Sequence, residues 1–295
     1  YPLIGNYGIN LEDNESETPK VKGFIVREKC NFPNNFRCEI GLEDYLKQNK
    51  IIGLEGIDTR ALTKILRNNG TMRGIISLEH SSLDEVEEKI KAFSNKEAVS
   101  IVSTKEAYTI EGTGKHVAIM DFGIKTNIIR NFKKRNCKIT VFPMTATAEE
   151  VLSVNPDLVF LSNGPGDPED LESVIENIKK IVGIKPIVGI CLGHQLLALT
   201  LGGKTTKLKF GHRGCNHPVK DLEKNRVHIT SQNHGYVVDE LPEGVVATHM
   251  NINDGTIEGM KHTTLPIYSV QFHPEAAAGP KDSEYIFDRF MEYAL

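Results

Sequence analysis

The stretch Lys185-Pro-Ile-Val-Gly-Ile-Cys-Leu-Gly-His-Gln195 decides how this 295-residue chain folds around a reactive residue. Its first half is apolar and rich in β-branched residues, which is typical of a short buried strand, whereas residues 195–201 have the pattern of a helix. Cys191 therefore lies where a strand turns into a helix, between Gly189 and Gly193. This arrangement is the G-x-S-x-G nucleophile elbow with sulfur in place of oxygen.

Two physical properties of such an elbow favour a reactive thiolate at Cys191. Small flanking residues permit a strained turn and a close approach of substrate. The N-terminus of the following helix stabilises the thiolate, which is the nucleophilic form. The alternative interpretation is a small buried hydrophobic residue at the end of a core strand. Motifs elsewhere in the chain favour the nucleophile.

A second apolar stretch, Tyr268-Ser-Val-Gln-Phe-His-Pro-Glu275, predicts the partners that a cysteine nucleophile needs. Proline keeps the chain extended, so His273 and Glu275 project to the same side. Histidine can take and return a proton near pH 7, and a carboxylate on its other ring nitrogen fixes the tautomer. Taken alone, His273 is an ordinary strand-end histidine. With Cys191 it predicts a Cys-His-Glu triad, because strand ends in an open α/β sheet meet at one crevice.

A loop rich in glycine and proline, Ser162-Asn-Gly-Pro-Gly-Asp-Pro168, follows the predicted strand at residues 157–161. It lacks the Gly-x4-Gly-Lys-[Ser/Thr] spacing of a phosphate-binding loop. By composition alone it is a plain turn. Its position one βα unit before Cys191 favours another role. A glycine N–H of this loop and the N–H of Leu192 are placed to stabilise a tetrahedral oxyanion.

Together, the three motifs resemble the signature of class I (triad) glutamine amidotransferases, over roughly residues 115–295. The resemblance implies that Cys191 attacks the carboxamide of glutamine and forms a γ-glutamyl thioester with release of ammonia. It also implies that His273 and Glu275 complete the triad. The oxyanion donors that it implies are Gly164 and Leu192, and the glutamine-pocket residues are Gly164, Gly166, Leu192 and Gln195.

Other segments resemble one branch of that family, the small, glutamine-hydrolysing subunit of carbamoyl-phosphate synthetase. They are residues 1–6, 56–67, 209–221 and 230–236. This resemblance implies that Asn233, Gly235 and Tyr236 also bind glutamine. It further implies that the family carries a segment ahead of Tyr1, with a serine that contacts glutamine.

The same resemblance implies a partner and a pathway. A large synthetase subunit would receive the ammonia and use ATP and bicarbonate to make carbamoyl phosphate for pyrimidine and arginine biosynthesis, in a heterodimer or a higher oligomer. We expect no cofactor in this chain, and ATP with magnesium on the partner.

Two alternative functions stay open. One is the glutaminase subunit of another class I amidotransferase, such as one of anthranilate or guanylate synthesis, although those enzymes have nothing that resembles residues 56–67. The other is a catalytically silent docking subunit, against which the presence of all three triad residues argues. Glutamine turnover with and without a partner distinguishes them.

A metal site is not predicted. The candidate ligands are His194, His212, Cys215, His217 and His234. They lack the C-x2-C and H-x3-H spacings that are typical of zinc sites.

Composition sets bounds on the partners and the compartment. A net charge of −4 and a pI near 6.2 argue against nucleic acid as the main partner. No apolar run approaches the ~20 residues that span a bilayer, so we expect no membrane insertion. Five cysteines without framework spacing fit a reducing cytoplasm.

We expect an α/β chain with two domains. Residues 1–107 form a smaller, mixed α/β domain with a docking role, incomplete at its start and including a strand at residues 71–78. Residues 108–115 form a linker. Residues 116–295 form the amidotransferase domain, a mostly parallel sheet flanked by helices. Short antiparallel strands are expected after residue 202.

Overall fold

The computed structural model describes residues 1–77 and 82–294, which form two compact units, Tyr1–Ser94 and Asn95–Leu295. The border between the units lies ahead of the predicted linker. Residues 108–110, expected in that linker, form an edge strand in the sheet of the larger unit. Within the described ranges, no helix has the length and apolar character needed to cross a membrane.

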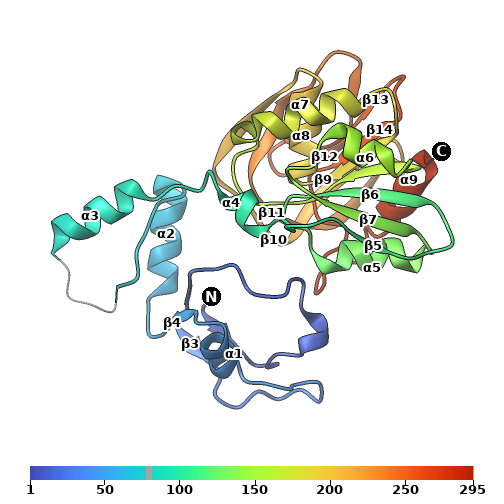
Figure 1. The fold of residues 1–295 in the computed structure, drawn as a ribbon. Helices are drawn as coiled ribbons and strands as arrows, with labels where there is room; N and C mark the ends of the chain where they lie inside the picture. Colours follow the sequence, from blue (N-terminus) through green and yellow to red (C-terminus); the bar gives the residue numbers. More distant parts are fainter. Residues whose placement is uncertain (78–81, 295) are drawn as a thin grey trace. The chain divides into compact units, whose positions relative to one another are not determined.

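The larger unit is built on one ten-stranded sheet (Figure 1). Its strands are β5 (Tyr108–Ile110), β6 (His116–Asp121), β7 (Lys138–Pro143), β8 (Leu158–Leu161), β9 (Ile187–Ile190), β10 (Lys204–Asp221), β11 (Arg226–Glu240), β12 (Val245–Asn251), β13 (Ile257–His262) and β14 (Ile267–Val270). Five neighbouring strands, in the order β14-β9-β8-β6-β7, run parallel. Strands covered on both faces need continuous apolar sequence, and β8, β9 and β14 are buried at every residue.

Helices cover both faces of the parallel strands. They are α5 (Thr126–Lys134), α6 (Ala148–Ser153), α7 (Glu172–Ile181), α8 (Leu192–Thr200) and α9 (Tyr285–Tyr293); α4 (Ala98–Val102) and the 3-10 turn η2 (Pro168–Asp170) are shorter. Alternate strand residues point to opposite faces. Met120 and Leu161 therefore pack in one core layer with α6, α7 and α8, and Ile119 and Phe160 pack in the other with α5 and α9.

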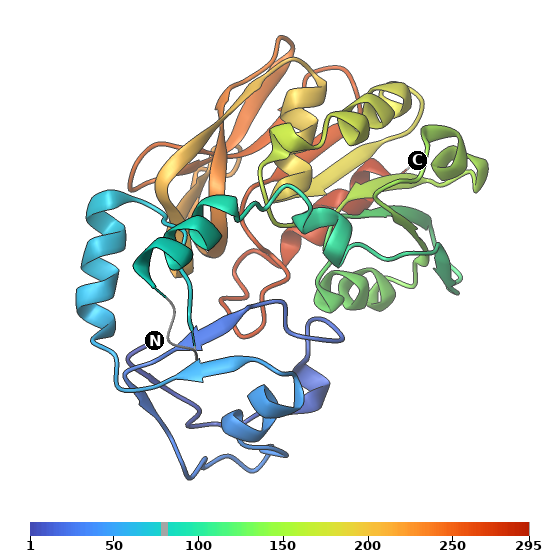
Figure 2. The same cartoon turned by 60° about the vertical axis from the view of Figure 1, so that its left-hand side comes forward.

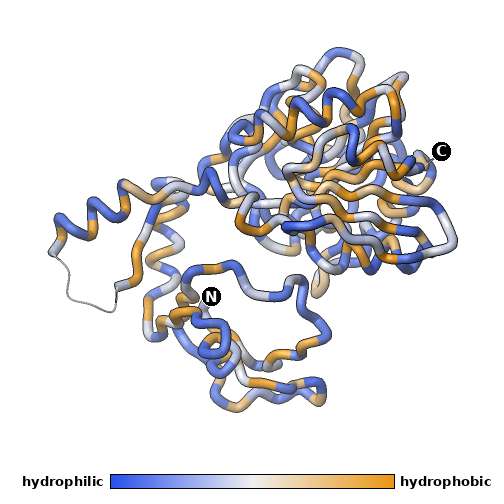
Figure 3. Tube along the Cα trace, in the orientation of Figure 1, coloured by the Kyte–Doolittle hydropathy of each residue, from blue (hydrophilic) through white to orange (hydrophobic). Residues whose placement is uncertain are grey.

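The figures show the same layering. Figures 1 and 2 both place α7 and α8 side by side. In Figure 3 the hydrophobic colouring follows the central strands, whereas the outer helices alternate between hydrophobic and hydrophilic residues. The carboxyl ends of the parallel strands therefore lie beside a well-packed core.

The remaining strands are antiparallel. β5 pairs with β7, and β13, β12, β10 and β11 extend the sheet beyond β14. A pair between Val238 and Ile257 also joins β11 to β13, so that these four strands close into a barrel-like group.

The sequence predicted the α/β class correctly but not the extent of the antiparallel part. Parallel pairing links five of the ten strands. The expectation of short strands after residue 202 is wrong for β10, which has 18 residues, and for β11, which has 15, whereas β12 and β13 are short, with 7 and 6 residues. Register shifts interrupt their pairing three times, and each shift breaks the alternation that marks a long strand in sequence.

The smaller unit consists of short elements. They are β1 (Leu3–Ile4), the 3-10 turn η1 (Leu11–Asp13), β2 (Gly23–Ile25), β3 (Glu28–Lys29), α1 (Leu42–Gln48), β4 (Ile52–Leu54), α2 (Thr59–Asn69) and α3 (Leu83–Ala92). Parallel pairs join β1 to β3 and β2 to β4. Asp58 caps α2, and Ser82 and Glu85 form a capping box at α3. The expected strand at 71–78 is not found at residues 71–77, and residue 78 lies outside the described residues.

Candidate active site

The predicted triad residues follow two adjacent strands at the same edge of the sheet. β9 and β14 are parallel neighbours, with Ile190 opposite Val270. Cys191 follows β9 directly, and its N–H donates to the carbonyl of Val270 at 2.9 Å. His273 lies three residues after the end of β14. The parallel pairing therefore brings together a cysteine and a histidine that are far apart in the sequence.

The backbone at Cys191 is a strained strand-to-helix turn. Its φ of 55° and ψ of −104° lie outside the regions that side-chain-bearing residues prefer. An ideal Cβ on Gly193 would lie 2.2 Å from the carbonyl oxygen of Leu161, and one on Gly189 would lie 2.9 Å from the backbone of Gly193. Both glycines are therefore required by close packing, as the elbow motif predicts. Cys191 itself is buried at the N-terminus of α8.

His273 and Glu275 form a buried pair. Nδ1 of His273 lies 2.7 Å from Oε1 of Glu275. Burial raises the pKa of Glu275, but the charges of His273 and Lys125 outweigh it and lower this pKa to about 2. Burial and Lys125 lower the pKa of His273, but Glu275 and Cys191 outweigh them and raise it to about 9. The pair is therefore a carboxylate and an imidazolium at neutral pH.

The second ring nitrogen of His273, Nε2, is the one available to the cysteine, because Nδ1 is occupied by Glu275. Nε2 is buried, and no described residue meets hydrogen-bond geometry with it. Cys191 nevertheless lies near enough to raise the pKa of His273. Catalytic hydrogen bonds are often long before substrate binds and tighten in the complex. The geometry therefore suits proton exchange between Cys191 and His273.

Sequence reasoning missed a lysine at this site. Nζ of Lys125 lies 3.1 Å from Oε1 of Glu275 and 3.3 Å from Nδ1 of His273. Asn127, two residues further on, donates from its side-chain amide to the backbone carbonyl of Glu275. Both residues lie at the start of α5, beyond the carboxyl end of β6. The sequence did contain a signal for Lys125, a charged residue shortly after a buried strand, because the carboxyl ends of parallel strands meet at one crevice.

The predicted oxyanion residues lie together. An ideal Cβ on Gly164 would lie 2.7 Å from the Leu192 side chain and 2.3 Å from the carbonyl oxygen of Phe122, so only glycine fits there. The N–H of Leu192 belongs to the first turn of α8, where N–H groups have no acceptor within the helix. Gly166 has a φ of 95°, which favours glycine.

Two of the predicted glutamine-pocket residues are in direct contact. Nε2 of Gln195 donates to the backbone carbonyl of Tyr236 at 2.7 Å and to Oε1 of Gln271 at 3.0 Å. Burial, together with a hydrogen bond to Asp167, raises the pKa of the Tyr236 phenol to about 12. Tyr236 thus joins α8 to the loop that carries Gly166.

Asn233 and Gly235 lie on β11 beside Arg213, an exposed residue of β10 that the sequence did not single out. Asn233 pairs with Arg213 across β10 and β11. One guanidinium nitrogen of Arg213 donates to the carbonyl of His234 at 2.7 Å, and an ideal Cβ on Gly235 would lie 3.8 Å from the other. Partial burial lowers the pKa of Arg213, and interaction with Cys191 opposes that shift. Arg213 is therefore near enough to the elbow to interact with it electrostatically.

His194 and Cys215 have different surroundings. His194 is fully buried, its Nδ1 lies 2.8 Å from the Ser269 hydroxyl, and burial lowers its pKa to about 3. It is therefore a neutral residue of the core. Cys215 is exposed, with its sulfur 3.5 Å from the Ser231 hydroxyl.

Two family models match this chain. The model described as glutamine amidotransferase class-I matches residues 118–293. The model described as carbamoyl-phosphate synthase small chain, CPSase domain, matches residues 1–76. The residues predicted to form the triad, the oxyanion loop and the glutamine pocket all lie within the first match.

Individual proteins are similar over nearly the whole chain. The carbamoyl phosphate synthase small chain of Clostridium perfringens is 75% identical over 295 residues, which covers 100% of this chain and 84% of the relative. The carbamoyl phosphate synthase pyrimidine-specific small chain of Bacillus subtilis is 51% identical, with 99% and 81% covered. The crystal structure of a GMP synthase-type protein from Thermoplasma acidophilum supports the fold alone, at 22% identity and a TM-score of 0.55 over 62% of this chain and 95% of that one.

The fold of the larger unit and its elbow are those of a class I glutamine amidotransferase. Its relatives share the smaller unit as well as the larger one. The chain therefore belongs to the family of carbamoyl phosphate synthase small chains, as its sequence motifs predicted.

Proposed function

We propose that this chain hydrolyses L-glutamine to glutamate and ammonia, with Cys191 as the nucleophile, and that the ammonia supports carbamoyl phosphate synthesis. The observation that carries the proposal is the strained elbow at Cys191 beside the buried His273–Glu275 pair. A nucleophile, a base and an orienting carboxylate in this order are the elements of a catalytic triad.

The reaction follows from these roles. The Cys191 thiolate attacks the carboxamide carbon of glutamine, and the carbonyl oxygen becomes an oxyanion. The N–H groups of Gly164 and Leu192 stabilise that oxyanion. When the carbon–nitrogen bond breaks, the imidazolium of His273 donates its proton to the leaving ammonia. Water, deprotonated by His273, then hydrolyses the γ-glutamyl thioester and releases glutamate.

Glutamine is held by residues around the elbow. In this proposal, Gly166 and Gln195 bind glutamine on the side of the oxyanion groups, and Asn233, Gly235 and Tyr236 bind it on the other side. The contact between Gln195 and Tyr236 supports this assignment. Backbone groups supply several of these contacts, which is why small residues are placed there.

The ammonia is used on a large synthetase subunit, which binds ATP with magnesium and receives bicarbonate. The term small chain in the names of the relatives supports a larger partner, in a heterodimer or a higher oligomer. The pyrimidine-specific name of the Bacillus relative supports pyrimidine synthesis, and arginine synthesis is the second use of the product. We infer the cytoplasm as the compartment, and the five free cysteines support this inference.

Replacement of Cys191 by serine tests the proposal in the complex with the large subunit. Cys191→Ser is expected to abolish glutamine hydrolysis, because serine is a poor nucleophile in a site built for a thiolate. Synthesis driven by added ammonia is expected to continue, since ammonia bypasses the cysteine. Cys30→Ser, in the smaller unit, is the matched control and should retain both activities. Glutamine hydrolysis near the wild-type rate in Cys191→Ser would show that this chain uses another nucleophile.

A further inference from the structure

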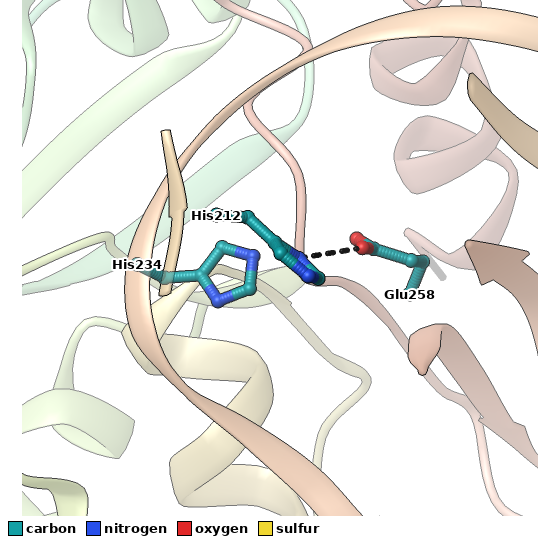
Figure 4. Close-up of side chains that lie close together, drawn as sticks. All are labelled: His212, His234 and Glu258. Atoms are coloured by element: carbon teal, nitrogen blue, oxygen red, sulfur yellow. Dashed lines mark ion pairs between the residues drawn. The ribbon is translucent and has the colours of Figure 1, made fainter. Parts of the chain in front are cut away.

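A cluster of three buried, ligand-type side chains lies in the barrel-like group β10–β13, apart from the triad. His212 is on β10, His234 on β11 and Glu258 on β13. Their ligand atoms all lie within 4.8 Å of one another. Figure 4 shows the His212 ring between the His234 ring and the Glu258 carboxylate. We propose that these side chains form a binding site for a divalent transition-metal ion such as zinc.

The outer hydrogen bonds of both histidines have the pattern of metal ligands. Nε2 of His212 lies 2.7 Å from a carboxylate oxygen of Asp254. Nδ1 of His234 lies 2.8 Å from the backbone carbonyl of Tyr236. Histidines that bind metal usually donate their other N–H to a carboxylate or a carbonyl, which fixes the tautomer. The lone pairs of His212 Nδ1 and His234 Nε2 are then free for a cation.

The two inward-facing ring nitrogens are hydrogen-bond acceptors, and neither has a donor among the described residues. His212 Nδ1 is buried without a hydrogen-bond partner among the described residues, 3.5 Å from Oε1 of Glu258. His234 Nε2 lies 2.7 Å from Oε1 of Gln232. The Gln232 amide is oriented by its own N–H, which donates to Oε2 of Glu258 at 2.8 Å. His234 Nε2 and Gln232 Oε1 are therefore two acceptors that face each other. A cation bound between the two histidines and Glu258 would give each of these acceptors a partner.

The donor set selects the type of ion. Two imidazoles and a carboxylate suit zinc and similar transition metals, whereas magnesium and calcium prefer oxygen ligands only. Zinc–nitrogen bonds near 2.0 Å give ligand–ligand distances of roughly 3.3 Å in a tetrahedron. The distance of 3.5 Å between His212 Nδ1 and Glu258 Oε1 is close to that value. In the proposed complex, the His234 ring moves closer to the ion when the ion binds. Oε1 of Gln232 or a water completes the coordination.

One outer partner of the site is partly exposed to solvent, and another is shared with the predicted glutamine pocket. Asp254 is 39% exposed at its side chain, so its carboxylate can attract a cation from solvent. The Tyr236 carbonyl that accepts from His234 also accepts from Gln195. Sequence spacing did not indicate the site, because its three ligands come from three different strands.

Zinc binding to the purified natural chain tests the proposal by calorimetry and X-ray absorption. We expect one zinc ion per chain with nitrogen and oxygen ligands at this site. Glu258→Gln and His212→Asn should weaken binding by more than about 100-fold, and Asp254→Asn by about 10- to 100-fold, the range for outer-sphere partners. His262→Asn, on β13 outside the cluster, is the matched control and should bind zinc as the wild type does.

Each alternative result contradicts the proposal. Sulfur ligands in the absorption spectrum would place the zinc on the free cysteines. Unchanged zinc affinity in Asp254→Asn and His212→Asn would place the zinc at another site. Absence of binding at micromolar zinc would show that hydrogen bonds, and not a metal ion, hold these side chains together. Melting curves recorded with chelator identify any variant that does not fold. Because Asp254 is partly exposed, Asp254→Asn is expected to fold. This variant therefore tests the proposal even if Glu258→Gln does not fold.

Discussion

The ammonium of Lys125 lies 3.1 Å from Oε1 of Glu275, a carboxylate whose side chain has no exposed surface. The same ammonium lies 3.3 Å from Nδ1 of His273. A cation beside an imidazolium is unusual, because each destabilises the other. Here the buried carboxylate between them compensates both charges, and Lys125 sets how tightly His273 holds its proton.

Removal of this cation is expected to shift the pH profile of glutamine hydrolysis. Lys125 lowers the pKa of His273, so Lys125→Met should raise it further. The alkaline limb of kcat/KM, where the imidazolium loses its proton, is then expected to move to higher pH. Lys179→Met, on the exposed face of α7, is the control and should leave the limb in place. A limb that stays fixed or moves to lower pH in Lys125→Met would show that Lys125 does not act through His273.

The His273–Glu275 pair should stabilise the larger unit in a defined pH window. Glu275 has its pKa lowered from 4.5 to about 2, so its contribution is complete above pH 4.5 and is lost as the pH falls toward 2. His273 has its pKa raised from 6.5 to about 9, so its contribution is complete below pH 6.5 and is lost as the pH rises toward 9.

Glu275→Gln removes both contributions. The difference in unfolding free energy between wild type and Glu275→Gln is therefore expected to be largest between pH 4.5 and 6.5. Denaturant unfolding followed by circular dichroism at a series of pH values measures it. A difference that is constant across the series would mean that packing, and not charge, dominates the pair.

The oxyanion loop should not tolerate a side chain at Gly164. Its Cβ would lie 2.3 Å from the carbonyl oxygen of Phe122, so Gly164→Ala must displace the loop. Loss of one oxyanion donor costs about 10²–10³ in kcat, and we expect a decrease of that size. Gly74→Ala, whose Cβ meets nothing within 4 Å, is the control for a glycine-to-alanine change. A wild-type kcat with an intact melting temperature in Gly164→Ala would exclude this loop from the oxyanion site.

The sequence predicted best what depends on neighbours along the chain. The cap at Asp58 and the capping box at Ser82 are hydrogen bonds between residues three apart, so they depend on local sequence alone. The elbow at Cys191 was also predictable, because the spacing of Gly189 and Gly193 indicates that backbone segments approach closely there. These features need no knowledge of which strands pair.

Features that depend on strand pairing were not predicted. Lys125 reaches the triad because β6 and β14 belong to one sheet, and Glu258 meets His212 because β13 and β10 belong to one closed group. Neither of these two arrangements of strands can be recognised from the spacing of residues in the sequence. The bulges of β10 and β11 conceal long strands in the same way, since each one reverses the faces of the residues that follow.

Coupling to the partner should govern the rate of this site. A freely running glutaminase would waste glutamine, and the loop from Gly164 to Gly166 can change its backbone angles at little cost because both ends are glycine. An oxyanion donor displaced by about 1 Å can cost about 10²-fold in rate. We therefore expect slow hydrolysis by the isolated chain and a markedly higher kcat after the large subunit is added.

The decisive measurement compares glutamine turnover for the chain alone, for its complex, and for the complex with ATP and bicarbonate. The measurement uses the natural polypeptide. The rate should rise at both steps, since docking orders the loop and synthesis draws on the ammonia. The Gly164→Ala variant should lose most of this activation, whereas Gly74→Ala should keep it. Equal turnover in all three states would make the chain an autonomous glutaminase and exclude control through the loop.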